Sequence, residues 1–370
     1  MSVSELEQLL ADLVRVPSPS GAEGPAADQA ASWLSERGVA VERVGDSVVA
    51  RVGGASGGPL LLLNTHLDTV GAGEGWTVDP LAGCWEGDRL VGLGANDAKG
   101  SAAAMMWATA HLAGASADLP GTLVLALNAC EETTNAGMAD VLAYLGESHG
   151  PPDAAVTGEP TGLEVVRAQA GLAILELSWE GRACHAAHVA RVDHANALLA
   201  AARDLAALPE PWVLEGVHPL LGQSTMAVTV LQAGERHNQI PDRARAVVDA
   251  RLAPPHDAAE CVALLEAALP GAQVGVRSER LVPVETPADH PLVTVALECA
   301  GREGASGSST LSDMALLAGV PAVKCGPGLT ARSHAPDEFL TRTELDQGAA
   351  FYERLVPAAL VALATAEVGR

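Results

Sequence analysis

The sequence is poor in aromatic residues, in basic residues and in long apolar runs, and each shortage excludes a class of protein. Aromatic side chains make up 3% of the 370 residues, so a stacking platform for single-stranded nucleic acid is not expected. The 22 Lys and Arg face 46 Asp and Glu, and this net charge of -24 disfavours nucleic acid as a partner. No stretch approaches the roughly 18 consecutive apolar residues of a membrane helix. We therefore expect no membrane-spanning segment.

The six cysteines are scattered, with no CxxC pair and no cluster. That spacing is typical of reduced cysteines in a cytosolic protein rather than of a disulfide framework. Residues 1–16 have acids among their apolar positions, and they lack the basic leader and the continuous apolar run of a signal peptide. We therefore expect a cytoplasmic protein.

What the chain does contain is sufficient for a folded core. It is 48% hydrophobic, which is ordinary for a globular protein, and its length suggests two domains at about 150 residues each. Short apolar runs begin at Leu60, Thr122, Ala154 and Pro321, with helical segments such as 101–112 between them. This alternation predicts an α/β domain, with a mostly parallel sheet covered by helices on both faces.

The middle of the chain follows another pattern, in which strand-like and helix-like segments take the order β-α-β-β-α-β. These segments are 172–179, 194–208, 226–231, 244–252, 257–269 and 274–280. The order is that of the ferredoxin-like split motif. We predict that residues 1–169 and 283–370 form one domain and that residues 170–282 form a second domain inserted into it.

Polar side chains that can bind a metal follow the apolar runs of the predicted sheet. Ligands collect beyond the carboxyl ends of the strands in an open α/β sheet. The residues found there, or in a glycine-rich loop before a helix, are His66, Asp68, Asp97, Glu131, Glu132, Glu159 and His334. Histidine and carboxylate are ligands that zinc accepts. These positions therefore predict a metal site at one edge of the sheet.

The number of ligands suggests two metal ions. Two metals about 3.5 to 4 Å apart need a bridging carboxylate, and Asp97 can supply it. His66 and Glu159 would then complete one site, and Glu132 and His334 the other. Neither Glu131 nor Asp68 is needed as a ligand. Glu131 can act as the general base toward water, and Asp68 can orient the imidazole of His66.

Each of these motifs also has an ordinary structural interpretation. A lone His-x-Asp can be a histidine satisfied in a turn, a Glu pair can be a solvated helix start, and Asp97 can be an N-cap. The metal site is favoured because all the candidate ligands are expected at the same edge of the predicted sheet. A non-catalytic metal-binding scaffold is the alternative of another class, and Glu131 argues against it, because a purely structural site has no use for an unligated carboxylate.

Five motifs together resemble a known family. They are HLDTV at 66–70, GLG at 92–94 with Asp97 after it, EET at 131–133, GEPT at 158–161, and GPG at 326–328 with His334 and then PDE at 336–338. Over nearly the whole chain the sequence resembles the co-catalytic zinc aminoacylase and carboxypeptidase superfamily, and within it the acetylornithine deacetylases. The resemblance implies the same five ligands, with Glu131 as base and Asp68 orienting His66.

The resemblance also implies that the inserted domain is a lid and dimerisation domain. His185 matches a loop histidine that reaches the partner's active site and stabilises the oxyanion, although Cys184 stands where Gly is usual and His188 where Pro is frequent. Asn238 and Arg251 resemble lid residues that hold the substrate. An Arg fork suits a substrate carboxylate, and an ordinary surface ion pair is the alternative for Arg251.

The function expected from the resemblance is that of a homodimeric two-zinc amidohydrolase, with cobalt as a substitute metal. Its substrate would be a small N-acylated amino acid, N-acetyl-L-ornithine first, as in arginine biosynthesis. Deacylation of acetyl-lysine, acetylcitrulline or succinyl-diaminopimelate stays open, as does a dipeptidase or carboxypeptidase activity. Ser312-Asp313-Met314 resembles the acetyl-lysine branch.

Overall fold

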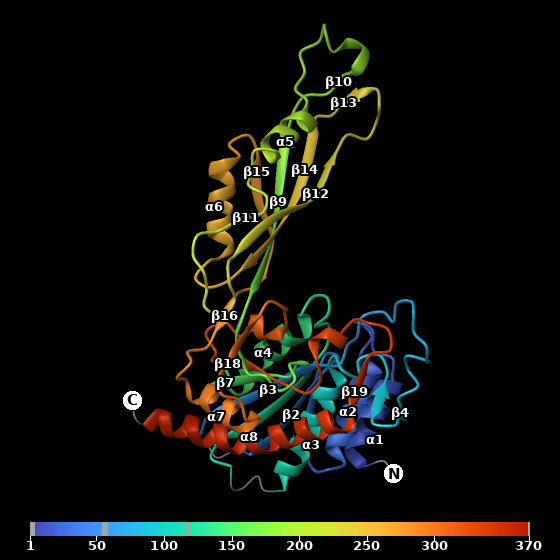
Figure 1. The fold of residues 1–370 in the computed structure, drawn as a ribbon, viewed down its shortest axis with the longest axis vertical. Helices are drawn as coiled ribbons and strands as arrows, with labels where there is room; N and C mark the ends of the chain where they lie inside the picture. The colour runs from blue at the N-terminus through green and yellow to red at the C-terminus, as the bar shows by residue number, and fades with distance from the viewer. Residues whose placement is uncertain (1–3, 54–57, 115–118, 369–370) are drawn as a thin grey trace. The chain divides into compact units, whose positions relative to one another are not determined.

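The chain separates into two compact units (Figure 1). The computed structural model describes residues 4–53, 58–114 and 119–368. Unit 1 comprises Met1–Arg167, Glu285–Ser306 and Ser312–Arg370, and unit 2 comprises Ala168–Val284 and Gly307–Leu311. The chain therefore leaves unit 1 twice: the first time it builds most of unit 2, and the second time it adds one short segment to unit 2.

The centre of unit 1 is a sheet whose middle strands are parallel. Its strands, in spatial order, are β1 (Ala40–Val44), β2 (Ser47–Gly53), β6 (Thr122–Asn128), β3 (Leu60–His66), β7 (Ala154–Thr157), β18 (Ala322–Lys324), β8 (Val166–Gln169) and β16 (Val284–Glu285), with β17 (Ser306–Ser308) beside β8. β6, β3, β7 and β18 pair in parallel, whereas β1, β2 and β6 pair antiparallel. Every residue of β3 is buried, which explains its continuous apolar run.

Helices and a small second sheet complete unit 1. The helices are α1 (Glu5–Arg15), α2 (Gly24–Ser35), α3 (Lys99–Ala113), α4 (Ala136–Ser148), α7 (Pro291–Ala300) and α8 (Arg342–Val368), with the 3₁₀ turns η3 (Asp313–Leu316) and η4 (Thr330–Arg332) and the strands β4 (Cys84–Glu86), β5 (Arg89–Val91) and β19 (Phe339–Thr341). α1 begins with a capping box, in which Ser4 accepts from the Glu7 amide and Glu7 accepts from the Ser4 amide.

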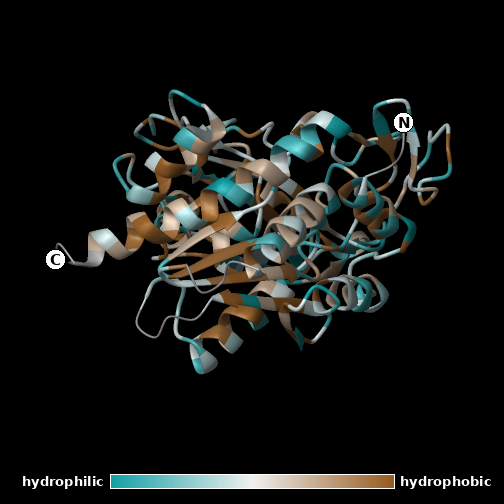
Figure 2. Cartoon of the chain, turned by 90° about the horizontal axis from the view of Figure 1, so that it is seen from below, coloured by the Kyte–Doolittle hydropathy of each residue, from teal (hydrophilic) through white to brown (hydrophobic). Residues whose placement is uncertain are grey.

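The core of unit 1 is built mainly from Ala, Leu and Val, as the low aromatic content requires. Figure 2 shows the strands of its sheet in brown, the colour of hydrophobic residues. Among the described residues, α8 alone is long and apolar enough to cross a membrane by length and composition. However, it packs against α3 and α7, and its Phe351, Tyr352 and Leu355 are buried in the core.

Unit 2 is an antiparallel sheet with helices on one face. Its elements are β9 (Gly171–Glu180), β10 (Cys184–His185), η2 (Ala186–His188), α5 (Ala197–Leu205), β11 (Trp212–Val213), β12 (Thr225–Ala233), β13 (Gln239–Ile240), β14 (Arg243–Leu252), α6 (Ala258–Ala268) and β15 (Gln273–Leu281). The main sheet has the order β11-β12-β14-β9-β15. Leu175 and Leu177 of β9 face the helices, whereas Glu176 between them is exposed. The predicted fold class, α/β with a ferredoxin-like insertion, is confirmed.

Candidate metal centre

The structure brings the predicted ligands together at the carboxyl ends of the parallel strands. His66 is the last residue of β3, and Glu159 comes two residues after β7. Glu131 and Glu132 lie in the turn between β6 and α4. Because these strands run in the same direction, their ends deliver all four side chains to one edge of the sheet.

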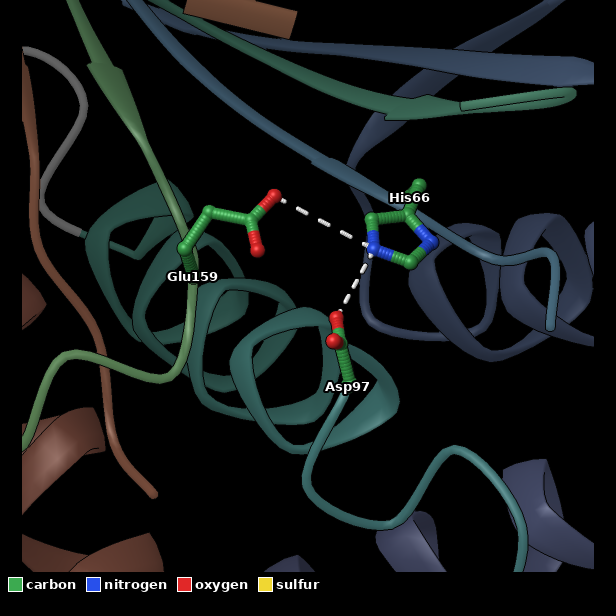
Figure 3. A group of neighbouring side chains, drawn as sticks. All are labelled: His66, Asp97 and Glu159. Carbon is green, nitrogen blue, oxygen red and sulfur yellow. Dashed lines mark hydrogen bonds and ion pairs between the residues drawn. The ribbon is translucent and has the colours of Figure 1, made fainter. Parts of the chain in front are cut away.

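Asp97 lies at the middle of the cluster and faces a histidine with each of its two oxygens. Its Oδ1 is 3.2 Å from His66 Nε2, and its Oδ2 is 3.8 Å from His334 Nε2. Glu159 Oε1 lies 4.0 Å from the same His66 nitrogen, as Figure 3 shows. His66, Asp97 and Glu159 therefore form a first group whose ligand atoms all lie within 4.8 Å of one another.

A second group shares Asp97 with the first. It consists of Asp97, Glu132 and His334, and Glu132 Oε1 lies 3.0 Å from His334 Nε2. His66, Glu131 and Glu132 form a third group with the same spacing. Two ligand sets joined by one carboxylate suit a pair of divalent cations, because a bridging carboxylate offers one oxygen to each.

Asp68 contacts three of the predicted site residues and holds them in place. Its carboxylate accepts hydrogen bonds from the backbone N–H groups of Glu131 and Glu132 at 3.0 and 3.1 Å, and it lies 3.5 Å from His66 Nδ1. Ser20 Oγ donates to it at 2.7 Å. The sequence analysis missed Ser20, whose loop follows α1 and carries no local signal of this long-range contact.

A second carboxylate outside the predicted set supports the Asp97 loop. Glu338 is buried, and its Oε1 accepts the N–H groups of Asn96 and Asp97, both at 2.8 Å. Asn96 in turn accepts the Leu329 N–H at 2.9 Å and donates to Ser333 Oγ at 3.2 Å. These bonds connect the loop of Asp97 to the loop that precedes His334. The PDE motif was the available signal for Glu338.

Crowding of acids controls the electrostatics of the cluster. Burial, followed by the charge of Asp97, raises the pKa of Glu159 to about 8, and burial raises the pKa of Glu131 well above its usual range. Burial alone would lower the pKa of His66, but the carboxylates of Asp68 and Asp97 raise it well above the ordinary value. Negative charge thus accumulates in a buried site, and divalent cations there would neutralise it.

The chain has only two lysines, Lys99 and Lys324, and both are buried in unit 1. Lys99 comes two residues after Asp97, and its ammonium donates to the carbonyls of Leu13 and Val16, both at 3.0 Å. Burial lowers the pKa of Lys99 to about 8. Lys99 thus attaches the start of α3 to the last carbonyls of α1, where a cation is favoured by the helix dipole.

We expect Lys99→Met to lower the free energy of unfolding by about 2 kcal/mol, because methionine fills the space but removes the ammonium that donates to the carbonyls of Leu13 and Val16. Urea unfolding with an unchanged m-value measures the effect. Arg354→Met is the matched control, since Arg354 makes a cation-carbonyl bond to Cys299 at 2.9 Å on the exposed surface. Equal losses in the two variants would contradict the assigned role of Lys99.

The predicted oxyanion donor His185 and the predicted substrate-binding residues Asn238 and Arg251 lie in unit 2. His185 is exposed on β10, and Asn238 precedes β13, which pairs with β10. Arg251 lies on the sheet face away from the helices and donates to Asp249 through Nε at 2.8 Å and Nη2 at 3.2 Å. In this structure Arg251 therefore makes the ion pair that the sequence analysis held as its alternative.

A helix-flanked, mostly parallel sheet with this ligand cluster at its carboxyl edge defines a metal-dependent hydrolase that acts on amides. A comparison with protein families agrees with this class of enzyme. The profile of peptidase family M20/M25/M40 matches residues 62–358. The chain belongs to this family.

Similar proteins support the assignment over the whole chain. A protein of Pyrobaculum aerophilum named as a LysW-lysine/LysW-ornithine hydrolase is 29% identical, over 93% of this chain and 95% of that one. The acetylornithine deacetylase of Pectobacterium carotovorum is 28% identical, over 92% and 94%. A solved M20 family metallo-carboxypeptidase from Sulfolobus solfataricus superposes with a TM-score of 0.77 at 20% identity, covering 97% of this chain and all of the other. The predicted recognition and enzyme class are confirmed.

Proposed function

We propose that the protein is a two-zinc deacylase that removes the acetyl group from N-acetyl-L-ornithine. The observation that carries the proposal is the shared aspartate, because Asp97 places one oxygen toward each of two histidine-carboxylate sets. His66 and Glu159 would hold one cation, and Glu132 and His334 the other. Bound cations would supply Lewis-acid polarisation of the scissile carbonyl.

Glu131 is the proposed general base. It lies in one group with His66 and Glu132, yet the two cation sets are complete without it. Its carboxyl group therefore lies beside both cation sets without being needed by either, which is the position expected of a group that takes a proton from water there. Glu131 would take a proton from the attacking water and return it to the leaving amine.

His185 is the proposed oxyanion donor, acting from the partner subunit of a homodimer. Its Nδ1 accepts the Ala187 N–H at 3.1 Å, so the neutral ring carries its proton on Nε2. Nε2 of this exposed side chain is then the donor available to a developing oxyanion. Apolar residues exposed on α5 and β12 support a dimer through unit 2: Leu198, Leu199, Val230 and Leu231.

His185→Ala is expected to lower turnover roughly 100- to 1000-fold, the effect of removing one oxyanion donor, with little change in metal content. Mixing it with inactive Glu131→Gln subunits tests whether the histidine acts across the interface. Each mixed dimer would then contain one site with both groups intact, and part of the activity should return. If His185 acts within its own chain, every site lacks one group and mixing restores nothing.

The substrate proposal rests on charge and on the relatives. Both relatives described above have names that refer to hydrolysis of an ornithine derivative. The net charge of -24 attracts a cationic amino-acid side chain, which acetylornithine and acetyl-lysine have and acetylcitrulline lacks. A cytoplasmic location fits the six cysteines, all of which are free thiols.

A substrate panel with zinc and with cobalt tests this proposal. It should contain N-acetylornithine, N-acetyl-lysine, N-acetylcitrulline, N-succinyl-diaminopimelate and unmodified dipeptides. The highest kcat/KM is expected for N-acetylornithine, and acetylcitrulline should rank below both cationic substrates. If a dipeptide or N-succinyl-diaminopimelate had the highest kcat/KM, the proposed substrate would be wrong, whereas the family assignment would stand.

A further inference from the structure

The loop between β6 and α4 carries both Glu131 and Glu132, and its two ends are asparagines. Asn128 is the last residue of β6, and Asn135 is the N-cap residue of α4. Only the six residues 129–134 lie between them. The positions of the proposed base and of one proposed ligand therefore depend on how these ends are held.

Asp313 holds both ends of this loop with one carboxylate. Its Oδ2 accepts from Asn128 Nδ2 at 2.7 Å, and its Oδ1 accepts from Asn135 Nδ2 at 3.0 Å. All three side chains are buried, at 1%, 0% and 3% exposure, so no bulk water substitutes for these bonds. Asp313 is the first residue of η3, which lies far from the loop in the sequence.

The middle of the loop is held from its other side. Asp68 accepts the N–H groups of Glu131 and Glu132, and Cys130 O accepts the N–H groups of Thr134 and Asn135 at 3.0 and 2.7 Å. These bonds define the shape of the turn. They do not connect the two end side chains to each other. Asn128 also donates to Met138 Sδ of α4 at 3.3 Å, but Asp313 alone of these groups accepts from both asparagines.

We propose that Asp313 is a positioning residue, which sets the placement of Glu131 and Glu132 by clamping the two ends of their loop. This role rests on the proposed function of those two residues. A buried carboxylate is costly, and a pair of apolar side chains could fill the same volume. A carboxylate with two amide donors adds directional bonds, and a shift of about 1 Å in a catalytic group is enough to slow a reaction strongly.

Two variants release the clamp in different ways. Asp313→Ala removes both bonds. Asn135→Gly removes one of the two clamp bonds and keeps the bond between Asn128 and Asp313, and glycine suits this position because Asn135 has a φ of 55°. Asp153→Ala is the matched control, since Asp153 accepts the Leu60 N–H at 2.7 Å at the start of β3, the opposite end of the strand from His66.

Hydrogen exchange of peptides spanning the loop is the first measurement, because it needs neither metal nor substrate. The N–H groups of Glu131 and Glu132 should exchange at least about tenfold faster in Asp313→Ala and in Asn135→Gly, and at the wild-type rate in Asp153→Ala. Metal affinity is measured by cobalt titration, and it should weaken roughly ten- to 100-fold in the two clamp variants. Turnover at saturating cobalt should fall by a similar factor, with KM nearly unchanged.

The double variant separates a clamp from a merely structural role. If the two residues act through one device, Asp313→Ala combined with Asn135→Gly should lose no more turnover than Asp313→Ala alone. Independent, additive losses would overturn the proposal, as would wild-type exchange and turnover in Asn135→Gly. Asn135→Gly keeps the test valid if Asp313→Ala does not fold. If the wild type hydrolyses none of the acyl amino acids, the proposed function fails, whereas loop exchange still decides the clamp.

Discussion

Glu131→Gln is expected to retain its metal and to lose turnover by roughly 100- to 10,000-fold, the range typical of removing a general base. Glutamine keeps the length and shape of the side chain but has no basic oxygen that can take a proton. The amide N–H groups of Glu131 and Glu132 would still bind Asp68, so the loop geometry should survive. Steady-state kinetics with metal analysis on the same sample makes the measurement.

The adjacent residue provides a matched control. Glu132→Gln changes the same side chain by the same atoms, one position further along the loop. Because Glu132 lies in the group of Asp97 and His334, this variant should lose metal rather than retain it. A Glu131→Gln enzyme with near-native turnover, or one that loses metal as Glu132→Gln does, would show that the two roles are wrongly assigned.

Removal of metal is expected to abolish activity completely and to leave most of the fold intact. Two of the proposed ligands are attached to rigid parallel strands, since every residue of β3 is buried and β7 is buried throughout. The core clusters of both units consist of apolar side chains and need no cation. The apoprotein should therefore keep its circular dichroism spectrum.

Elemental analysis, activity and circular dichroism on one chelated sample test this expectation. Zinc or cobalt added back should restore turnover, with up to two ions per chain. Active enzyme with a metal content near zero would exclude the metal mechanism. A chelated protein that unfolds would instead show that the cations are structural.

Much of the fold could be anticipated because its signals are local. The run at Leu60–Leu63 is continuous because β3 is covered on both faces, and the alternation in β9 arises because only one face of the sheet in unit 2 is covered. Such patterns depend on neighbours within a few residues. They identify strands and helices without any knowledge of the pairing order.

The gathering of metal ligands could be anticipated for a related reason. Parallel strands end at one edge, so a His after one strand and a Glu after another must approach each other. The direction of the strands does not reveal which atoms of these side chains contact each other. That Asp97 turns one oxygen to His66 and the other to His334 depends on a loop held by Glu338, 241 residues away from Asp97.

Read alone, the sequence therefore established the fold class, the edge at which the site lies and the residue types able to hold cations. The supporting contacts appeared only in three dimensions. Asp313 bonds Asn128 and Asn135 across 185 and 178 residues. Nothing in the local pattern around Asp313 distinguishes it from a solvated cap of a short turn, because a hydrogen bond between distant segments depends on how the whole chain packs them together. The hydrogen-bond donors that a buried carboxylate contacts are therefore known only from the tertiary structure.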